Sequence, residues 1–455
     1  MLEIITNITY QLNTILWGPV MIVFLFGTHL YMSFKTGFIQ KYTFKGIKLS
    51  LSKDEDSEGD ISPFAALTTA LASTIGTGNI IGVSTAIVSG GPGAVFWTWI
   101  TGILGISTKY AESYIAIKHR KKLSDGSYIG GAMTALEKIN LKPLGIVFAL
   151  ITLCASFGIG CGVQSNAIAD LLKTNYQIPV VITSVIVAIL TAIVIFGGVK
   201  SISKTCETLV PVMSILYTLG CLVILIINHD VLFETIQLIV VSAFSPRAAM
   251  GGFIGSSIMT AARYGIARGL FSNEAGLGSA PIVASVSKTN NAAKIALINA
   301  TGVFWDTVVV CLMTGLVLCT SIVKNPEIMA VGINGGELAS LCFAQIKYIG
   351  TPLLVFGVLT FAYSTILGWN YYGERCLKYL NEKTSAKLYY VVWVVVAFIG
   401  GIVNLDLIWK IADNLNALMV VPNLIAVILM RKLIVKDLNY YVYQDHLDEK
   451  DVEME

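Results

Sequence analysis

The sequence predicts an all-α protein that crosses a lipid bilayer many times, and three observations support this prediction. The 455 residues are 55% hydrophobic and only 13% charged, whereas an ordinary soluble domain is about 25% charged. The apolar residues form blocks of roughly 20 residues or more, the length that a helix needs to cross the hydrocarbon core. The alternating strands of an outer-membrane barrel do not occur. Since the net charge is only +3 and the basic residues are dispersed, no nucleic-acid partner is expected.

Eleven apolar blocks, bounded by charge clusters, are expected to be transmembrane helices. Their approximate ranges are 12–33, 61–88, 93–117, 143–171, 178–198, 206–228, 251–287 (interrupted), 294–321, 349–373, 388–404 and 407–430. Two further segments, 231–245 and 335–346, are expected to be short helices on the outer face. The acidic end of the chain after Lys436 is expected to be frayed and solvated.

The lysines and arginines predict the orientation of these helices in the cell membrane. If eleven spans are correct, 23 of the 31 basic residues fall in loops on one side and four fall in loops on the other. Cytoplasmic loops carry the excess of basic residues. The amino terminus is therefore expected outside and the carboxyl terminus in the cytoplasm.

Two spans are interrupted near their middles by glycines and polar residues. The second span contains Ser73 to Gly82, and the seventh contains Ser272 to Pro281. Glycines also allow close packing between membrane helices, so one such interruption alone would indicate little. A broken helix within a membrane, however, needs protein or a water-filled cavity to satisfy its backbone. Two interruptions therefore predict two discontinuous helices around a central site.

The two interrupted spans are five crossings apart, which predicts an inverted repeat. Paired interruptions in inverted repeats are typical of secondary transporters and mark their binding site. The predicted architecture is one peripheral amino-terminal helix plus a core of five and five helices. Its parts are the first helix with its cytoplasmic linker (1–60), the first repeat (61–230), an external helix with the second repeat (231–430), and a polar cytoplasmic tail (431–455).

Several motifs resemble those of the sodium:alanine (alanine or glycine:cation) symporter family. The most specific is the run Gly90 to Ile100 with Gly102 and Gly105, in which Thr98 stands where the family usually has methionine. Similar motifs occur at Ser73–Asn79, Val163–Ala167, Phe271–Pro281 and Ser364–Glu374. The resemblance extends from about residue 12 to residue 432. It implies a leucine-transporter-type fold and cotransport of alanine or glycine with sodium.

Within that framework, an amino acid at mid-membrane needs partners for both of its charges. The carboxylate is expected to meet the N–H groups of Thr77, Gly78 and Asn79. The ammonium is expected to meet carbonyls near Phe271 and Ser272. The other substrate contacts are expected from Asn273, Gly276 and Gln164, with the large rings of Phe157 and Trp369 limiting the volume. Each of these side chains could instead serve only in packing between helices.

The resemblance also places one sodium ion between the second and ninth spans. Sodium is a hard cation that prefers oxygen ligands. The expected ligands are the carbonyls of Ala72, Ile75 and Phe361 and the hydroxyls of Ser364 and Thr365. A second sodium site at Asn79, completed by Asn299, is a weaker expectation. Charged residues in or near the spans include Asp306 and Glu274, and a gating ion pair of Glu274 with Arg263 or Arg268 is expected.

Other functions fit the sequence less well. An ion channel would need a continuous polar pore, and an enzyme would need a catalytic motif such as HExxH or GxSxG, which the sequence lacks. A proton-coupled amino-acid transporter of the same fold is the nearest alternative. The expected mechanism is alternating access in which sodium binds first. No cofactor other than sodium as the coupling ion, and no obligate protein partner, is expected.

Overall fold

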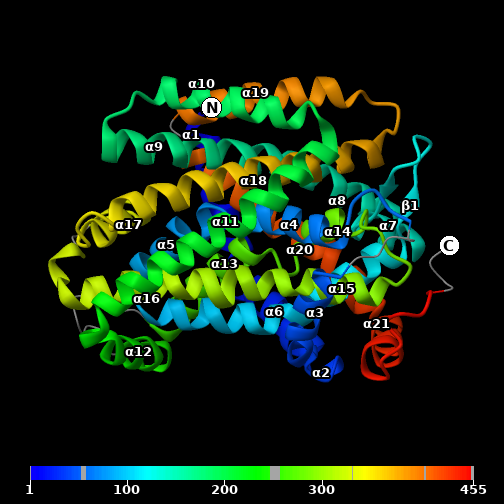
Figure 1. Cartoon of the computed structure of the whole chain (residues 1–455), viewed down its shortest axis with the longest axis horizontal. Coiled ribbons are helices and arrows are strands. Elements are labelled where there is room, and N and C mark those ends of the chain that lie inside the picture. Colours follow the sequence, from blue (N-terminus) through cyan, green and yellow to red (C-terminus); the bar gives the residue numbers. More distant parts are fainter. Residues whose placement is uncertain (1, 53–57, 246–256, 330–331, 404–405, 452–455) are drawn as a thin grey trace.

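The computed structural model describes residues 2–52, 58–245, 257–329, 332–403 and 406–451, and these residues form a helical bundle. The long helices run roughly along one axis of the molecule, with α10 and α19 together at one edge and α12 and α2 at the opposite edge (Figure 1). The helices of the first half are α1 (Leu2–Leu16), α2 (Pro19–Lys35), η1 (Ile39–Tyr42), α3 (Thr43–Ser50), α4 (Pro63–Thr74), η2 (Thr77–Asn79), α5 (Ile81–Gly90), α6 (Gly93–Lys118), α7 (Ala132–Lys138), α8 (Lys142–Ala155), η3 (Ser156–Gly162), α9 (Val163–Tyr176), α10 (Val180–Ile195) and α11 (Gly198–Ile227).

The second half continues in the same way. Its helices are α12 (His229–Phe244), α13 (Ile258–Asn273), α14 (Ala280–Ala284), α15 (Ala292–Val303), η4 (Phe304–Cys311), α16 (Leu312–Lys324), η5 (Pro326–Ile328), α17 (Gly335–Ala344), α18 (Gly350–Leu380), α19 (Ala386–Ile402), α20 (Asp406–Leu429), α21 (Arg431–Asp437) and η6 (Leu438–Tyr443). A small antiparallel ribbon pairs β1 (Lys121–Lys122) with β2 (Tyr128–Ile129).

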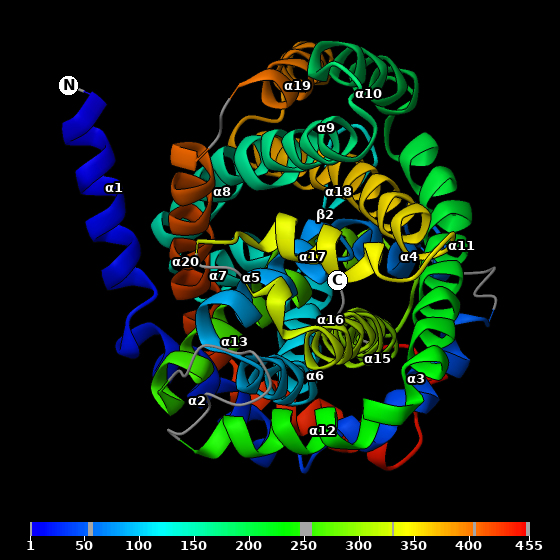
Figure 2. The same ribbon diagram turned by 90° about the vertical axis from the view of Figure 1, so that its left-hand side faces the viewer.

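Each of the eleven predicted ranges contains helical residues, but the first range is not one straight helix. Helices α1 and α2 meet at a bend of 41°, because Gly18 is extended and Pro19 begins α2. Figure 2 shows α1 beside α20 at the margin of the bundle. Among the described residues, five helices are long and apolar enough to cross a membrane, or six if this bent pair is one span. The chain is therefore a multi-pass membrane protein.

The two interrupted spans are broken where the sequence predicts. The first consists of α4, η2 and α5, and the second of α13 and α14. Helix α13 ends where Glu274 adopts a left-handed conformation (φ 54°), followed by Gly276 (φ 90°), a region that favours glycine. The beginning of α4 and the end of α14 lie together, since Ile61 and Ser287 form a backbone bridge. Helix α5 packs against α13 at the other end, so the two broken spans run antiparallel.

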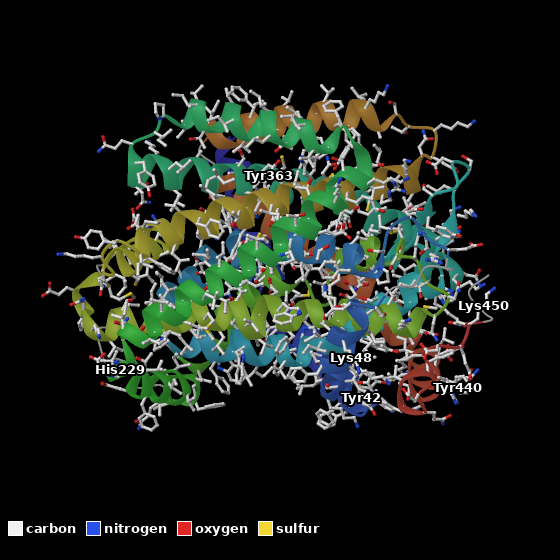
Figure 3. All side chains as sticks on the ribbon, in the orientation of Figure 1. Tyr42, Lys48, His229, Tyr363, Tyr440 and Lys450 are labelled. Carbon is white, nitrogen blue, oxygen red and sulfur yellow. The ribbon has the colours of Figure 1, made fainter. Side chains whose placement is uncertain are left out.

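Short helices close the end of the molecule opposite to the carboxyl terminus. The predicted helices at 231–245 and 335–346 are confirmed as α12 and α17. His229 at the start of α12 and Lys450 near the carboxyl terminus lie at opposite ends (Figure 3). The breaks lie between these two ends.

The prediction of a frayed tail is wrong as far as Asp451. Helices α21 and η6 fold back onto the end of α6, where the buried amine of Lys118 pairs with Asp437 at 3.6 Å and with Asp451. The Asn291 side chain also donates to the Glu449 carbonyl at 3.0 Å. Two of the acidic residues after Lys436, Asp437 and Asp451, are thus partners of this buried lysine.

Candidate functional site

The break after α4 leaves two carbonyl oxygens without their usual helical donors. In a continuous helix, the Ala72 carbonyl would accept from the Gly76 amide and the Ile75 carbonyl from the Asn79 amide. The Gly76 amide donates instead to Asn79 Oδ1 at 2.8 Å, and the Asn79 amide donates to the Gly76 carbonyl at 3.2 Å. The Ala72 carbonyl thereby loses its helical donor, and the Ile75 carbonyl accepts hydrogen bonds from hydroxyls of α18 instead.

Helix α18 presents two hydroxyls to this break. Ser364 Oγ lies 3.4 Å and Thr365 Oγ1 lies 3.3 Å from the Ile75 carbonyl oxygen. Both hydroxyls lie 2.9 Å from the Phe361 carbonyl oxygen. At a cation–oxygen distance of about 2.4 Å, typical of calcium and close to that of sodium, two ligands at a right angle are about 3.4 Å apart. In this structure the Ser364 and Thr365 hydroxyls donate hydrogen bonds to both carbonyls, and their distances of 3.4 and 3.3 Å to the Ile75 carbonyl match the spacing of two oxygens that share a cation.

Helices α4 and α18 can meet at this site because Gly368 lacks a side chain. A Cβ atom at Gly368 would lie 2.0 Å from Ser73 Oγ and 2.9 Å from the Ser73 backbone nitrogen. Both distances are far below van der Waals contact. The glycine thus sets the separation of the carbonyls on α4 from the hydroxyls on α18.

Replacing Gly368 by alanine is therefore expected to push α18 away from α4 and to raise the sodium concentration needed for half-maximal activity. Overpacking of this kind costs about 1–3 kcal/mol, which corresponds to about a 5- to 150-fold weaker sodium response. Gly27→Ala is the matched control, because a Cβ atom at Gly27 meets nothing within 4 Å. An unchanged sodium response in Gly368→Ala would contradict this role for the glycine.

Gln164 links the break to helix α9. The Thr77 amide donates to Gln164 Oε1 at 3.2 Å, and Gln164 Nε2 donates to the Ile159 carbonyl at 3.1 Å. Ile159 lies in η3, a π-helical segment, and such segments often occur at functional sites. Within the described residues, the buried Thr77 hydroxyl has no hydrogen-bond partner. It is therefore available to a bound molecule.

Asp306 joins the two broken spans, a role that the sequence does not reveal. Its carboxylate accepts from Asn79 Nδ2 at 2.7 Å, from Ser272 Oγ at 2.9 Å and from Thr307 Oγ1 at 2.7 Å. Asp306 is fully buried in the π-helical segment η4. The one sequence feature that points to this role is that Asp306 is a single aspartate within a long apolar block. Because the donors come from both breaks, this carboxylate positions them relative to each other.

Phe271 and Asn273 also lie where α13 ends. The Phe271 ring packs over Gly78, where a Cβ atom would lie 2.8 Å from the ring, and stacks on Trp409 with ring centroids 6.2 Å apart. Asn273 Nδ2 donates to Thr307 Oγ1 at 3.1 Å, and its Oδ1 accepts from the Ala275 amide at 2.9 Å. The ends of η2 and α13 are thus in direct contact.

A buried charged cluster holds the unwound segment after α13 from its other side. Glu112 Oε2 accepts from the amides of Gly276 and Gly278 at 3.0 and 3.2 Å. Lys109 Nζ lies 3.2 Å from Glu112 Oε1 and donates to the Glu274 carbonyl at 2.9 Å. Gly276 therefore faces this cluster, and a Cβ atom there would meet Leu25 at 2.9 Å.

The expected ion pair of Glu274 with an arginine is wrong. The Glu274 carboxylate accepts from Ser279 Oγ at 2.5 Å, and Arg268 lies 3.8 Å from Asp413 Oδ1. The cation beside Glu274 is Lys109, which the linear sequence places 165 positions away. The sequence does not predict this contact between the Lys109 amine and the Glu274 carbonyl, because the two residues are far apart in the chain.

The remaining candidates are spread around the breaks. Trp369 lies within hydrogen-bonding reach of Glu274, whereas the Phe157 ring packs on Tyr389 and Trp393 of α19, with centroids 5.4 Å away in each case. Asn299 donates to Ser113 Oγ at 2.7 Å, so its amide group has a partner within the bundle.

The chain is similar to proteins named as sodium symporters. The chain is 45% identical to "Sodium/alanine symporter AgcS" of Methanococcus maripaludis over 95% of this chain and 96% of that protein. It is 34% identical to "Probable sodium/glutamine symporter GlnT" of Bacillus subtilis over 98% of this chain and 92% of that protein.

Solved structures share the fold at low sequence identity. A Na⁺-coupled sialic acid symporter matches with a TM-score of 0.54 and 17% identity, covering 93% of this chain and 86% of that one. MhsT, solved in complex with L-phenylalanine, matches with a TM-score of 0.56 and 16% identity, covering 84% of this chain and 96% of that one. These proteins have the leucine-transporter-type fold. The profile of the sodium:alanine symporter family matches residues 2–455, and the chain therefore belongs to the sodium:alanine symporter family.

Proposed function

We propose that this protein carries alanine, and also glycine, into the cell together with sodium by alternating access. The observation that carries this proposal is the set of oxygens at the first break. Carbonyls of Ile75 and Phe361 and hydroxyls of Ser364 and Thr365 come together between α4 and α18. A hard cation prefers such ligands. The family and its sodium-symporter relatives support the coupling ion.

Sodium is a transported substrate here. In this proposal the Ala72 carbonyl is the fifth oxygen ligand, because the Gly76 amide donates to Asn79 and leaves that carbonyl without its helical donor. All five ligands are neutral. An ion held only by dipoles is released more readily than one held by carboxylates, because ligand charge raises affinity. This composition suits an ion that must leave the site in every cycle.

The amino acid is placed between the two breaks. The Thr77 and Asn79 amides, which were expected to bind its carboxylate, donate to Gln164 Oε1 and to the Gly76 carbonyl in this structure. The carboxylate would therefore accept from the Thr77 hydroxyl, which has no partner among the described residues, and from the Gly78 amide. Its ammonium would donate to carbonyls at Phe271 and Ser272, where α13 ends. The Phe271 ring packs over Gly78 beside this position. Asn273 and Trp369 would lie around the substrate, whereas Gly276 faces the Lys109–Glu112 cluster and the Phe157 ring packs on α19.

We propose that the eleven helical ranges are eleven spans, arranged as a peripheral helix (1–60), two inverted repeats (61–230 and 231–430) and a cytoplasmic tail (431–455). The antiparallel course of the two broken spans supports the repeat. The tail and the basic segment at β1 lie at the same end of the molecule (Figure 1), which supports a cytoplasmic carboxyl terminus and an external amino terminus. The function requires no obligate protein partner.

Uptake of radiolabelled alanine by purified protein in liposomes tests this function. We expect an inward sodium gradient to drive accumulation, an inward proton gradient without sodium to fail, and unlabelled glycine to compete. Glutamine serves as the larger competitor, because one relative carries that amino acid in its name. Accumulation driven by protons without sodium would favour the proton-coupled alternative, and competition by glutamine alone would contradict the proposed substrate.

A further inference from the structure

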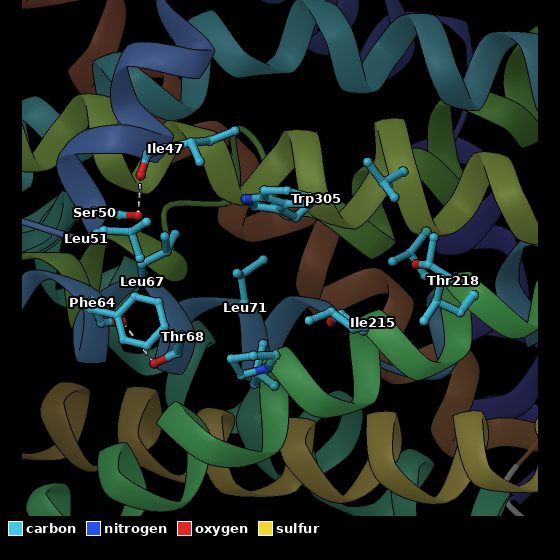
Figure 4. Close-up of a pocket in the computed structure, with 16 residues that line it drawn as sticks. Ile47, Ser50, Leu51, Phe64, Leu67, Thr68, Leu71, Ile215, Thr218 and Trp305 are labelled. Atoms are coloured by element: carbon cyan, nitrogen blue, oxygen red, sulfur yellow. Dashed lines mark hydrogen bonds between the residues drawn. The ribbon is translucent and has the colours of Figure 1, made fainter.

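A large apolar groove lies on the opposite side of α4 from the proposed transport site. Its volume is about 530 Å³, within the range of about 300–1,000 Å³ that is common for small-molecule sites. It lies between α3, α4, α11 and η4 (Figure 4). None of its lining residues belongs to the proposed sodium or substrate sites.

The walls of the groove are apolar because their hydroxyls turn toward their own helices. Ser50 Oγ donates to the Ile47 carbonyl at 2.7 Å, and Thr68 Oγ1 donates to the Phe64 carbonyl at 2.9 Å (Figure 4). In the part of the chain that the structure describes, Ser214 Oγ is buried without a hydrogen-bond partner. The surface presented to an occupant therefore consists of methyl, methylene and ring groups.

The groove opens toward the bilayer. Its floor is buried, with Leu71 6% and Val310 1% exposed, whereas Ile215 and Leu219 at its rim are 58% and 53% exposed. These rim residues lie on α11, which is long and apolar enough to cross a membrane. From Val212 to Ile227 the exposed residues of α11 are all apolar, so the natural surroundings of this part of the helix are lipid chains. An acyl chain can enter the groove from the bilayer without crossing water.

Basic residues lie at one end of the groove. Lys48 is exposed and follows the lining residue Ile47 on α3, on the half of the molecule that carries Lys450 (Figure 3). Lys204 is exposed on α11, seven and eleven residues before the lining residues Pro211 and Ile215, and therefore on the same helical face. Glu207, the acidic side chain nearby on α11, accepts a hydrogen bond from Ser62 at 3.3 Å.

We propose that this groove binds one acyl chain of an anionic phospholipid, with the headgroup at Lys48 and Lys204. The ligand comes from the leaflet on the side of the basic loops. Its chain packs against Leu71, the residue before the proposed sodium ligand Ala72, and against Trp305 and Val310 of η4. The proposal does not depend on which amino acid the protein transports.

Photolabelling in nanodiscs tests this site. The full-length protein is placed in phosphatidylcholine nanodiscs that contain a small fraction of phosphatidylglycerol with a diazirine near the end of one acyl chain. After illumination, labelled peptides are identified by mass spectrometry. We expect at least fivefold more label on the segments that contain Leu71 and Trp305 than on the outward face of α10.

Two groove-filling variants and one matched variant make the test specific. Ile215→Trp and Ser214→Leu are each expected to reduce groove labelling at least fivefold. Ile189→Trp on α10 is expected to leave it unchanged, because Ile189 is exposed to a similar extent (55%) but lies outside the groove. The double variant Lys48→Gln/Lys204→Gln is expected to reduce labelling to the level of a phosphatidylcholine probe. Three results would overturn the proposal. The groove could be labelled no more than α10, the labelling could survive both groove-filling variants, or the unmodified protein could be labelled equally by the phosphatidylglycerol and phosphatidylcholine probes.

Discussion

Replacing Asp306 by asparagine is expected to reduce sodium-driven alanine uptake by about 100-fold. The Asp306 carboxylate accepts hydrogen bonds from Asn79 on the first broken span and from Ser272 on the second. An asparagine turns an amide donor toward at least one of these donors. Hydrogen bonds to charged groups contribute about 1.5–3 kcal/mol each, so the loss of one such bond corresponds to about a 10- to 150-fold effect and weakens the link between the two breaks.

The matched control for this variant is Asp170→Asn, which removes an exposed carboxylate near the end of α9. Both variants are reconstituted at equal protein amounts after size-exclusion chromatography shows a monodisperse peak. We expect the control to transport like the unmodified protein. Uptake by Asp306→Asn within threefold of the unmodified protein would show that the carboxylate does not hold the breaks in their active arrangement.

The double variant Ser364→Ala/Thr365→Ala is expected to raise the sodium concentration for half-maximal uptake by about 30-fold or more, since each lost ligand to a cation costs about 1–1.5 kcal/mol. Both hydroxyls lie against the Ile75 and Phe361 carbonyls, so their removal leaves only the carbonyl ligands. The alanine concentration for half-maximal uptake should approach its usual value when sodium is saturating.

Thr360→Ala is the control for the double variant. Thr360 lies one turn before Ser364 on the same helix, and its hydroxyl donates to the carbonyls of Phe356 at 2.7 Å and Gly357 at 3.3 Å. Its sodium response should be that of the unmodified protein. If the double variant responds to sodium as Thr360→Ala does, Ser364 and Thr365 do not bind the ion.

The two breaks could be predicted because their signals are local. Gly76, Gly78 and Asn79 within an apolar block indicate an unwound helix wherever that block lies in the fold. The juxtaposition of α4 with α18 is not local, and it came from the resemblance to a known family. The structure brings Ile75 and Thr365 together across 290 positions of the sequence.

Other parts of the site could not be predicted, for two physical reasons. Asp306 lies in the π-helical segment η4, where the register departs from that of an α-helix, so helical periodicity does not show that its carboxylate faces the breaks. Contacts such as those of Lys109 with Glu274, or of Lys118 with Asp451, join residues far apart in the chain. A charge in the linear sequence does not reveal its partner.

Alanine binding to the purified protein with and without sodium tests the proposed coupling most directly. Isothermal titration in sodium chloride and in potassium chloride gives the two alanine dissociation constants. Coupling between two binding sites is reciprocal, and one ligand typically changes the affinity for the other 5- to 150-fold. We therefore expect sodium to tighten alanine binding by at least about tenfold, and alanine to tighten sodium binding by the same factor. Equal alanine affinity in the two salts would contradict a sodium-coupled site at the α4 break.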